Sequence, residues 1–202
     1  MNSALKHEPG GICAIVLAAG ASRRMGAQNK LLAEVGGVAM VRHVVTAALA
    51  SKLSAVVVVT GFEGGRIRAA LTGLDLRFVD NPDYADGLST SLRAGVGAAR
   101  DDCTGAVILL GDMPRISPAI IDRLVESFRA GEGRSICVPV FDRRRGNPVL
   151  WPRRFFSDLG AITGDRGGRD LLARLSDHVD PVNVDSPDIF FDVDTPDDLA
   201  ST

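Results

Sequence analysis

Three cations follow the first apolar run of the chain, in a loop that consists mostly of small residues. The run at residues 12–17 leads into Ala18-Ala19-Gly20-Ala21-Ser22, and Arg23, Arg24 and Lys30 come next. Small residues let backbone N–H groups approach an anion closely, and the cations add positive charge to the same loop. This combination suits a triphosphate, although a turn with solvated arginines is the alternative. Because the loop matches neither the Walker A sequence nor GxGxxG, P-loop hydrolysis and dinucleotide binding lose support.

Aspartates follow two later apolar runs. Asp112 comes directly after the run 106–110, in the sequence GDMP, and Asp194 lies in DVDTPDD at residues 192–198. Mg²⁺ binds proteins through one or two carboxylates together with substrate phosphates, so both aspartates are candidate metal ligands. The alternatives are that Asp112 caps a turn before Pro114 and that Asp194 caps a helix. Asp197 and Asp198 are interpreted as first-turn acids that favour the helix dipole.

Two further segments carry polar or basic side chains. Residues 80–92 read DNPDYADGLSTSL, which places hydroxyls and N–H groups at the start of a helix. Taken alone, this pattern is typical of a turn and an N-cap. The run Arg143-Arg144-Arg145-Gly146-Asn147-Pro148 fits either a solvated basic hairpin or a binding site for an anionic group.

The elements that must position these residues follow from continuous hydrophobicity. Apolar runs recur at residues 12–17, 55–59, 74–79, 106–110 and 136–140, which indicates strands buried on both faces, as in a parallel sheet. Helices are expected between them at 38–50, 63–71, 88–99 and 118–129, the last capped by Ser117 before Pro118. This alternation predicts a Rossmann-like, doubly wound α/β fold with a mostly parallel sheet flanked by helices.

The pattern changes after residue 140. Residues 141–151 are basic and loop-like and end in an extended segment at 147–151. Short helices are expected at 153–159 and 167–175, and short strands at 179–184 and 189–193. Thr195 is expected to cap a last helix at 196–200. We expect a flexible tail over residues 1–10 and a single domain over residues 11–202.

Composition and charge exclude several classes of protein. Of 202 residues, 46% are hydrophobic and 24% are charged, which is unlike disordered, collagenous or coiled-coil sequences. The net charge of −2 offers no basic field for nucleic acid or a membrane surface. The start MNSALKHEPG lacks a signal-peptide core, and no apolar run reaches the roughly 20 residues of a spanning helix. Cys13, Cys103 and Cys137 have no Cys/His cluster, which favours a reducing cytoplasm over a disulfide scaffold.

The pattern L-A-A-G-x-S-x-R-M-G followed by a lysine resembles the signature of the MobA-like nucleotidyltransferases. Within this group the chain most resembles the molybdenum cofactor cytidylyltransferase (MocA-type) branch, since Ala19 stands where the guanylyl-transferring branch usually has glycine. The resemblance implies a nucleotide-diphospho-sugar transferase-like fold. It also implies a nucleotide-binding part up to about residue 115 and an acceptor-side part from about 116 onward.

The same resemblance assigns roles to particular residues. Arg24, Lys30 and Asp112 are the implied catalytic residues, and Asp112 and Asp194 are the implied Mg²⁺ ligands. The implied nucleotide site comprises Leu17, Ala18, Ala19, Gly20, Arg24, Lys30, Asn81, Gly87 and Ser89, with Ser91 as a weaker candidate. Asn147, which replaces a histidine common in relatives, and the segment GDRGGR at residues 164–169 fall on the acceptor side.

The activity implied is transfer of CMP from CTP to the phosphate of Mo-molybdopterin, which gives molybdopterin cytosine dinucleotide and pyrophosphate. The expected partners are therefore CTP, a molybdopterin-type phosphorylated acceptor and a recipient molybdoenzyme, with no nucleic acid or membrane. Three alternatives stay open. The nucleotide is GTP, the acceptor is another phosphorylated compound such as a sugar or alditol phosphate, or the protein is a non-catalytic chaperone that carries molybdenum cofactor.

Overall fold

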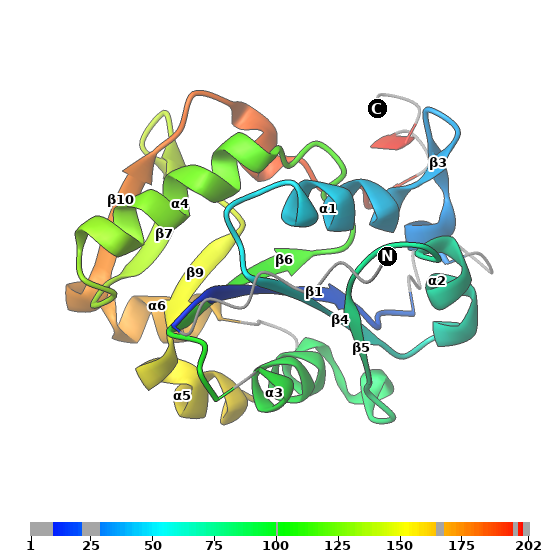
Figure 1. The fold of residues 1–202 in the computed structure, drawn as a ribbon, viewed down its shortest axis with the longest axis horizontal. Helices are drawn as coiled ribbons and strands as arrows, with labels where there is room; N and C mark the ends of the chain where they lie inside the picture. The colour runs from blue at the N-terminus through cyan, green and yellow to red at the C-terminus, as the bar shows by residue number, and fades with distance from the viewer. Residues whose placement is uncertain (1–9, 22–28, 100, 165–167, 196–197, 200–202) are drawn as a thin grey trace, which may run out of the picture.

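The apolar runs of the sequence form the strands of a central sheet in the computed structural model (Figure 1). The structure describes residues 10–21, 29–99, 101–164, 168–195 and 198–199. The strands of this sheet are β1 (Ile12–Ala18), β4 (Ala55–Thr60), β5 (Arg77–Asp80), β6 (Gly105–Leu110), β7 (Ile136–Phe141), β9 (Val149–Pro152) and β10 (Val179–Asn183), with the short β8 (Arg144–Arg145) beside β7.

The sheet has the order β10-β7-β9-β6-β1-β4-β5 and is mostly parallel. β1 lies in the middle and pairs in parallel with β4 on one side and with β6 on the other. The exception is β9, which runs antiparallel to both β6 and β7. Because β1, β4 and β6 are parallel, their carboxyl ends meet at one edge of the sheet, which is where ligands bind in open α/β folds.

Helices cover both faces of the sheet, as the sequence predicts (Figure 1). One face carries α1 (Met40–Leu49), α2 (Gly64–Ala70) and α4 (Pro118–Ala130), and the other carries α3 (Leu88–Ala98), α5 (Phe156–Gly160) and α6 (Arg169–Arg174). Short 3-10 helices are η2 (Lys30–Leu32), η3 (Tyr84–Asp86), η4 (Arg153–Phe155), η5 (Ser176–His178) and η6 (Pro187–Phe190). The predicted fold class is confirmed.

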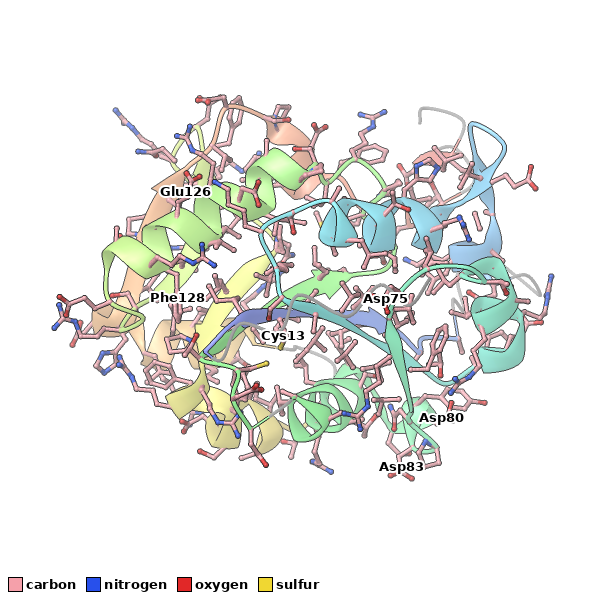
Figure 2. All side chains as sticks on the ribbon, viewed as in Figure 1. Cys13, Asp75, Asp80, Asp83, Glu126 and Phe128 are labelled. Atoms are coloured by element: carbon pink, nitrogen blue, oxygen red, sulfur yellow. The ribbon has the colours of Figure 1, made fainter. Side chains whose placement is uncertain are left out.

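The core lies in two layers that the sheet separates. Successive residues of β1 point to opposite faces, so Ala14 packs with α1 and α4 whereas Ile15 packs with α3 and α5. In α4, Phe128 is buried on the sheet side, while Glu126 lies on the solvent side (Figure 2). The predicted cap of α4 is confirmed, because the Ser117 hydroxyl accepts a hydrogen bond from Ile120 N–H at 3.4 Å.

Three predicted elements differ from the observed ones. The helix expected at 38–50 begins at Met40, because Gly36 and Gly37 have φ of 59° and 79° and form the turn of a small hairpin, β2 (Glu34–Val35) and β3 (Val38–Ala39). The strand expected at 74–79 begins at Arg77, where its pairing with β4 starts.

The strand expected at 189–193 is wrong. Pro187–Phe190 forms η6, which is capped by the Ser186 hydroxyl accepting from Asp188 N–H at 3.2 Å.

Two further observations concern membranes and cysteines. None of the helices in the described part of the chain is long and apolar enough to cross a membrane. Cys13, Cys103 and Cys137 are buried and form no disulfide bond, as expected for small apolar side chains in strands or beside them.

Candidate active site

The end of β1 forms the floor of the site. Leu17, Ala18 and Ala19 are buried, and the chain reaches the surface at Gly20. The Leu17 carbonyl accepts a hydrogen bond from Gly111 N–H at 3.0 Å, so the first residue after β6 remains paired with the end of β1. The predicted phosphate ligand Arg24 and its neighbour Arg23 lie outside the described residues.

Lys30 is held in place by its neighbour Asn29, which the sequence did not single out. Asn29 is 2% exposed; its Oδ1 accepts from Leu31 N–H at 3.1 Å and its Nδ2 donates to the Phe62 carbonyl at 3.3 Å. Both ends of this buried amide are therefore satisfied. The first bond caps η2 and the second ties Lys30 to the loop after β4.

The Lys30 ammonium lies between two of the predicted metal ligands. Its Nζ is 2.7 Å from Asp112 Oδ2 and 2.9 Å from Asp194 Oδ1. Asp112 follows β6, and Asp194 belongs to residues 187–194, which we call the carboxylate segment. The Val193 N–H donates to the Asp112 carbonyl at 3.0 Å and so fixes this segment against the end of β6.

This arrangement keeps Lys30 charged. Burial opposes its ammonium form, but the carboxylates of Asp112 and Asp194 outweigh burial and raise the pKa of Lys30 above its usual value. The ion pair is substantially shielded, since the Lys30 side chain is 14% exposed and that of Asp112 is 19% exposed. Residues 164 positions apart in the chain thus form one charged cluster.

A third carboxylate, Asp192, joins the two that were predicted. Oxygen atoms of Asp112, Asp192 and Asp194 lie within 4.8 Å of one another. Asp112 Oδ1 is buried and has no hydrogen-bond partner among the described residues. Three carboxylates, one of them with an oxygen left unsatisfied, form a donor set that fits a hard divalent cation such as Mg²⁺ or Mn²⁺.

Asp192 bears the electrostatic strain of this cluster. Partial desolvation by the surrounding protein, and then repulsion from Asp112 and Asp194, raise the pKa of the Asp192 carboxyl above its usual value, although its side chain is still exposed to solvent. The sequence contained a signal for this residue: side chains two apart in an extended backbone point the same way, and the intervening Val193 is fully buried.

The predicted base-reading residues surround the start of α3. Asn81 is buried; its Nδ2 donates to Thr90 Oγ1 at 2.9 Å and Ser91 Oγ at 3.0 Å, and its Oδ1 accepts from Asp83 N–H at 3.1 Å. Gly87, with φ of 107°, precedes α3, and Ser89 is 3% exposed. In this structure the Asn81 side chain therefore holds the turn and α3 together.

A pocket of about 610 Å³ lies on the α3 side of the sheet. Its walls are mostly apolar side chains from β1, α3, β6, β9 and α6, and include Leu17, Leu92, Ile108, Val149, Trp151 and Leu172. Its polar side chains are those of Arg145, Asn147 and Arg169. Leu17 and Leu110 line it at the ends of their strands, so the pocket reaches the edge of the sheet where Asp112 lies.

Strands β7 and β8 form a hairpin that carries the predicted basic run, residues 143–148, and joins this pocket to the carboxylate segment. Asp142 and Arg143 have φ of 47° and 63° and make its two-residue turn. The Asn147 N–H donates to the Ile189 carbonyl at 3.0 Å. Arg144 stacks on Phe190 with its guanidinium carbon 4.5 Å from the ring centre. Of the predicted segment 164–169, residues 165–167 lie outside the described residues.

Sequence comparison finds relatives that match along most of their length. The chain is 28% identical to the molybdenum cofactor cytidylyltransferase of Escherichia coli (strain K12), over 93% of this chain and 93% of the relative. It is also 28% identical to the nicotine blue oxidoreductase of Paenarthrobacter nicotinovorans, over 91% of this chain and 92% of that relative.

Structure comparison agrees with these matches. A nucleotidyl transferase from Methanothermobacter thermautotroptrophicus superposes with a TM-score of 0.81 at 26% identity, and 95% of each chain is covered. The family model described as the MobA-like NTP transferase domain matches residues 14–179, which include Lys30 and Asp112. The chain therefore belongs to the MobA-like NTP transferase family, a family of nucleotidyltransferases.

Proposed function

We propose that this protein transfers CMP from CTP to the phosphate of Mo-molybdopterin, with a divalent cation, Mg²⁺ in the cell, bound by Asp112, Asp192 and Asp194. The observation that carries the proposal is the meeting of Lys30 with carboxylates from two separate loops at the carboxyl edge of the sheet. A triphosphate and a metal need these opposite charges side by side. The choice of CTP rests on Ala19 and on the similarity to the cytidylyltransferase relative.

The reaction proposed is an in-line displacement at phosphorus. An oxygen of the acceptor phosphate forms a bond to the α-phosphorus of CTP, and the bond from that phosphorus to the oxygen bridging the β-phosphate breaks, releasing pyrophosphate. A phosphate monoester is already ionised at neutral pH, so the step needs no strong general base. Lys30 binds and neutralises phosphate oxygens, and Arg24 is proposed to do the same. A bound divalent cation supplies further neutralisation of the phosphates.

The pocket supports a large acceptor with extended apolar surface over a sugar or alditol phosphate. A sugar phosphate presents hydroxyls on every side and needs hydrogen-bond partners around it, because buried unpaired hydroxyls are costly. Among the described lining residues, the charged and amide side chains are those of Arg145, Asn147 and Arg169, and Trp151 adds one indole N–H to an otherwise apolar wall. We infer that ring surface lies in the pocket and that the arginines face anionic groups of the acceptor.

We also propose that residues up to about 115 bind the nucleotide, that residues from about 116 onward bind the acceptor, and that the protein acts in the cytoplasm. Delivery of the product to a recipient molybdoenzyme belongs to the same proposal. GTP is the second candidate nucleotide, since the resemblance extends to the guanylyl-transferring branch. The similarity to an oxidoreductase does not favour a redox reaction at this site, because the contacts among Lys30 and the carboxylates suit phosphate and metal chemistry.

Pyrophosphate release with purified molybdopterin and each of the four NTPs tests the proposal. We expect release above background with CTP, less with GTP, and none from a sugar phosphate acceptor. The Asp112→Asn variant should lose turnover by about 100-fold or more while its melting temperature stays within a few degrees. The matched control is Asp75→Asn, an exposed aspartate before β5 (Figure 2). Binding of nucleotide without consumption would support the chaperone alternative, and wild-type turnover in Asp112→Asn would refute the metal assignment.

A further inference from the structure

Lys30 occupies a place that a metal ion also needs. Its ammonium contacts Asp112 Oδ2 at 2.7 Å and Asp194 Oδ1 at 2.9 Å, and both carboxylates belong to the group that can surround a cation. The buried Asn29 side chain fixes η2 and therefore the Lys30 backbone. The contact of the Lys30 ammonium with the two carboxylates is thus set by the fold.

Two cations cannot share these oxygens without repulsion. An Mg²⁺ ion lies about 2.1 Å from a carboxylate oxygen, so an ion on Asp112 Oδ2 cannot be more than about 5 Å from the Lys30 ammonium in its present position, and an ion on the unsatisfied Oδ1 of the same carboxylate cannot be more than about 7 Å from it. At these separations, in a partly buried site, the repulsion between a divalent and a monovalent cation is strong. Either cation alone therefore compensates the carboxylate charge, whereas binding of both at these positions is opposed by their mutual repulsion.

We propose that the Lys30 ammonium is the resident counter-ion of the Asp112 and Asp194 carboxylates, which gives way when nucleotide and metal bind together. This inference rests on the proposed function. Without nucleotide, Lys30 weakens metal binding, because its ammonium already compensates the charge of both carboxylates and repels the incoming ion. With nucleotide present, the triphosphate offers the ammonium new anionic partners, so the carboxylates are released to the metal. Metal and nucleotide thus bind cooperatively, and Lys30 links them.

Burial makes this device effective. Lys30 with its side chain 14% exposed is poorly screened by solvent, in contrast to Lys52, whose side chain is 50% exposed in its ion pair with Glu126. The same shielding means that removing the ammonium leaves three carboxylates without the positive charge that contacts two of them. A variant without it should therefore accept a metal ion more readily than the wild type does.

The test measures Mn²⁺ binding to the purified protein by electron paramagnetic resonance of free Mn²⁺, with and without an unreactive α,β-methylene analogue of CTP. We expect Lys30→Met to bind Mn²⁺ at least fivefold more tightly than the wild type when nucleotide is absent. The analogue should tighten Mn²⁺ binding to the wild type at least tenfold and change that of Lys30→Met much less. Lys30→Arg keeps the charge and should bind Mn²⁺ as weakly as the wild type, and Lys52→Met serves as the surface control.

The outcomes separate the inference from the proposed function. Equal or weaker Mn²⁺ binding by folded Lys30→Met overturns the inference, because Lys30 would then organise the carboxylates without competing for them. If the wild type binds Mn²⁺ and releases pyrophosphate from CTP in that case, the proposed function stands. If no protein binds Mn²⁺ even with the analogue, the metal assignment and the inference both fail. Should Lys30→Met not fold, a wild-type affinity unchanged by the analogue would by itself refute the cooperativity.

Discussion

Gly146→Ala should disturb the carboxylate segment through a single methyl group. A Cβ at Gly146 would lie 2.5 Å from the Ile189 carbonyl oxygen and 2.7 Å and 2.8 Å from the Cγ1 and Cβ of the same residue. The backbone must therefore move by at least half an ångström to reach even the tight limit of 3.0 Å. Because the Asn147 N–H holds that carbonyl at 3.0 Å, the movement also strains a hydrogen bond.

The expected cost is about 1–3 kcal/mol, as for other overpacked sites. In a chain of this length the melting temperature falls by about 2–4 °C for each kcal/mol. Since Ile189 precedes Asp192 by three residues, the same movement should displace the metal ligands and weaken Mn²⁺ binding in the presence of nucleotide. Thermal unfolding and Mn²⁺ titration on the same sample measure the two effects.

Gly97→Ala is the matched control. A Cβ at Gly97, on the exposed side of α3, would have nothing within 4 Å. Alanine there should stabilise the helix by about 0.4–1 kcal/mol, because it restricts the unfolded chain. If Gly146→Ala is as stable as the wild type and binds Mn²⁺ equally well, the contact between the hairpin and the carboxylate segment is not the constraint that the geometry indicates.

Two smaller changes test the site and the fold separately. Asp192→Asn should weaken Mn²⁺ binding about tenfold, because one of three carboxylate charges is lost. Without metal at pH 7 the same variant should melt about 1–2 °C higher, a modest gain because Asp192 is exposed to solvent. The raised pKa of Asp192 means that its charged form destabilises the folded state above that pKa, so the gain should vanish in acid, below the pKa of the unfolded chain. Unchanged Mn²⁺ affinity would remove Asp192 from the metal site. Ser117→Ala should cost about 1 kcal/mol through loss of the α4 cap, measured by urea unfolding, and leave pyrophosphate release unchanged. A loss of turnover in that variant would contradict a purely structural cap.

The sheet was predictable because its central strands are buried on both faces. β1 and β4 are almost continuous runs of apolar residues. Such runs are typical of strands in a sheet that helices cover on both faces, because every side chain of the strand is then buried. The same rule failed at 189–193, where an apolar run of three residues, Ile189 to Phe191, is followed by Asp192 and Val193. There Ser186-Pro187-Asp188 begins a 3-10 helix, with the same cap and proline that correctly marked the start of α4 at Ser117 and Pro118. Capping chemistry should have outweighed hydrophobicity at this point.

The site residues were predictable where a charged side chain follows the end of a strand in the sequence. Asp112 and Lys30 follow from the resemblance, and their contact was foreseeable because β1 and β6 end at one edge. Their partners were not. Asn29 acts through a hydrogen bond to Phe62, which is 33 residues away, and no local pattern marks such a bond. Asp192 was missed because residues 189–193 were predicted as a strand and only Asp194 of the acidic cluster that follows was predicted as a metal ligand.

Buried polar atoms without partners in the described part of the chain, and one left-handed residue, lie at the edge where the sequence predicts the ligands. Two buried carboxylate oxygens lack partners among the described residues, Asp112 Oδ1 after β6 and Glu63 Oε2 after β4. Glu63 also has φ of 51°, a left-handed conformation that is costly for a side chain of its kind. Buried polar atoms without partners lower stability, so their concentration at the ends of two parallel strands needs a compensating cause. A cation and a triphosphate bound at that edge would satisfy the first oxygen directly, which is why Asp112→Asn should cost turnover and not stability.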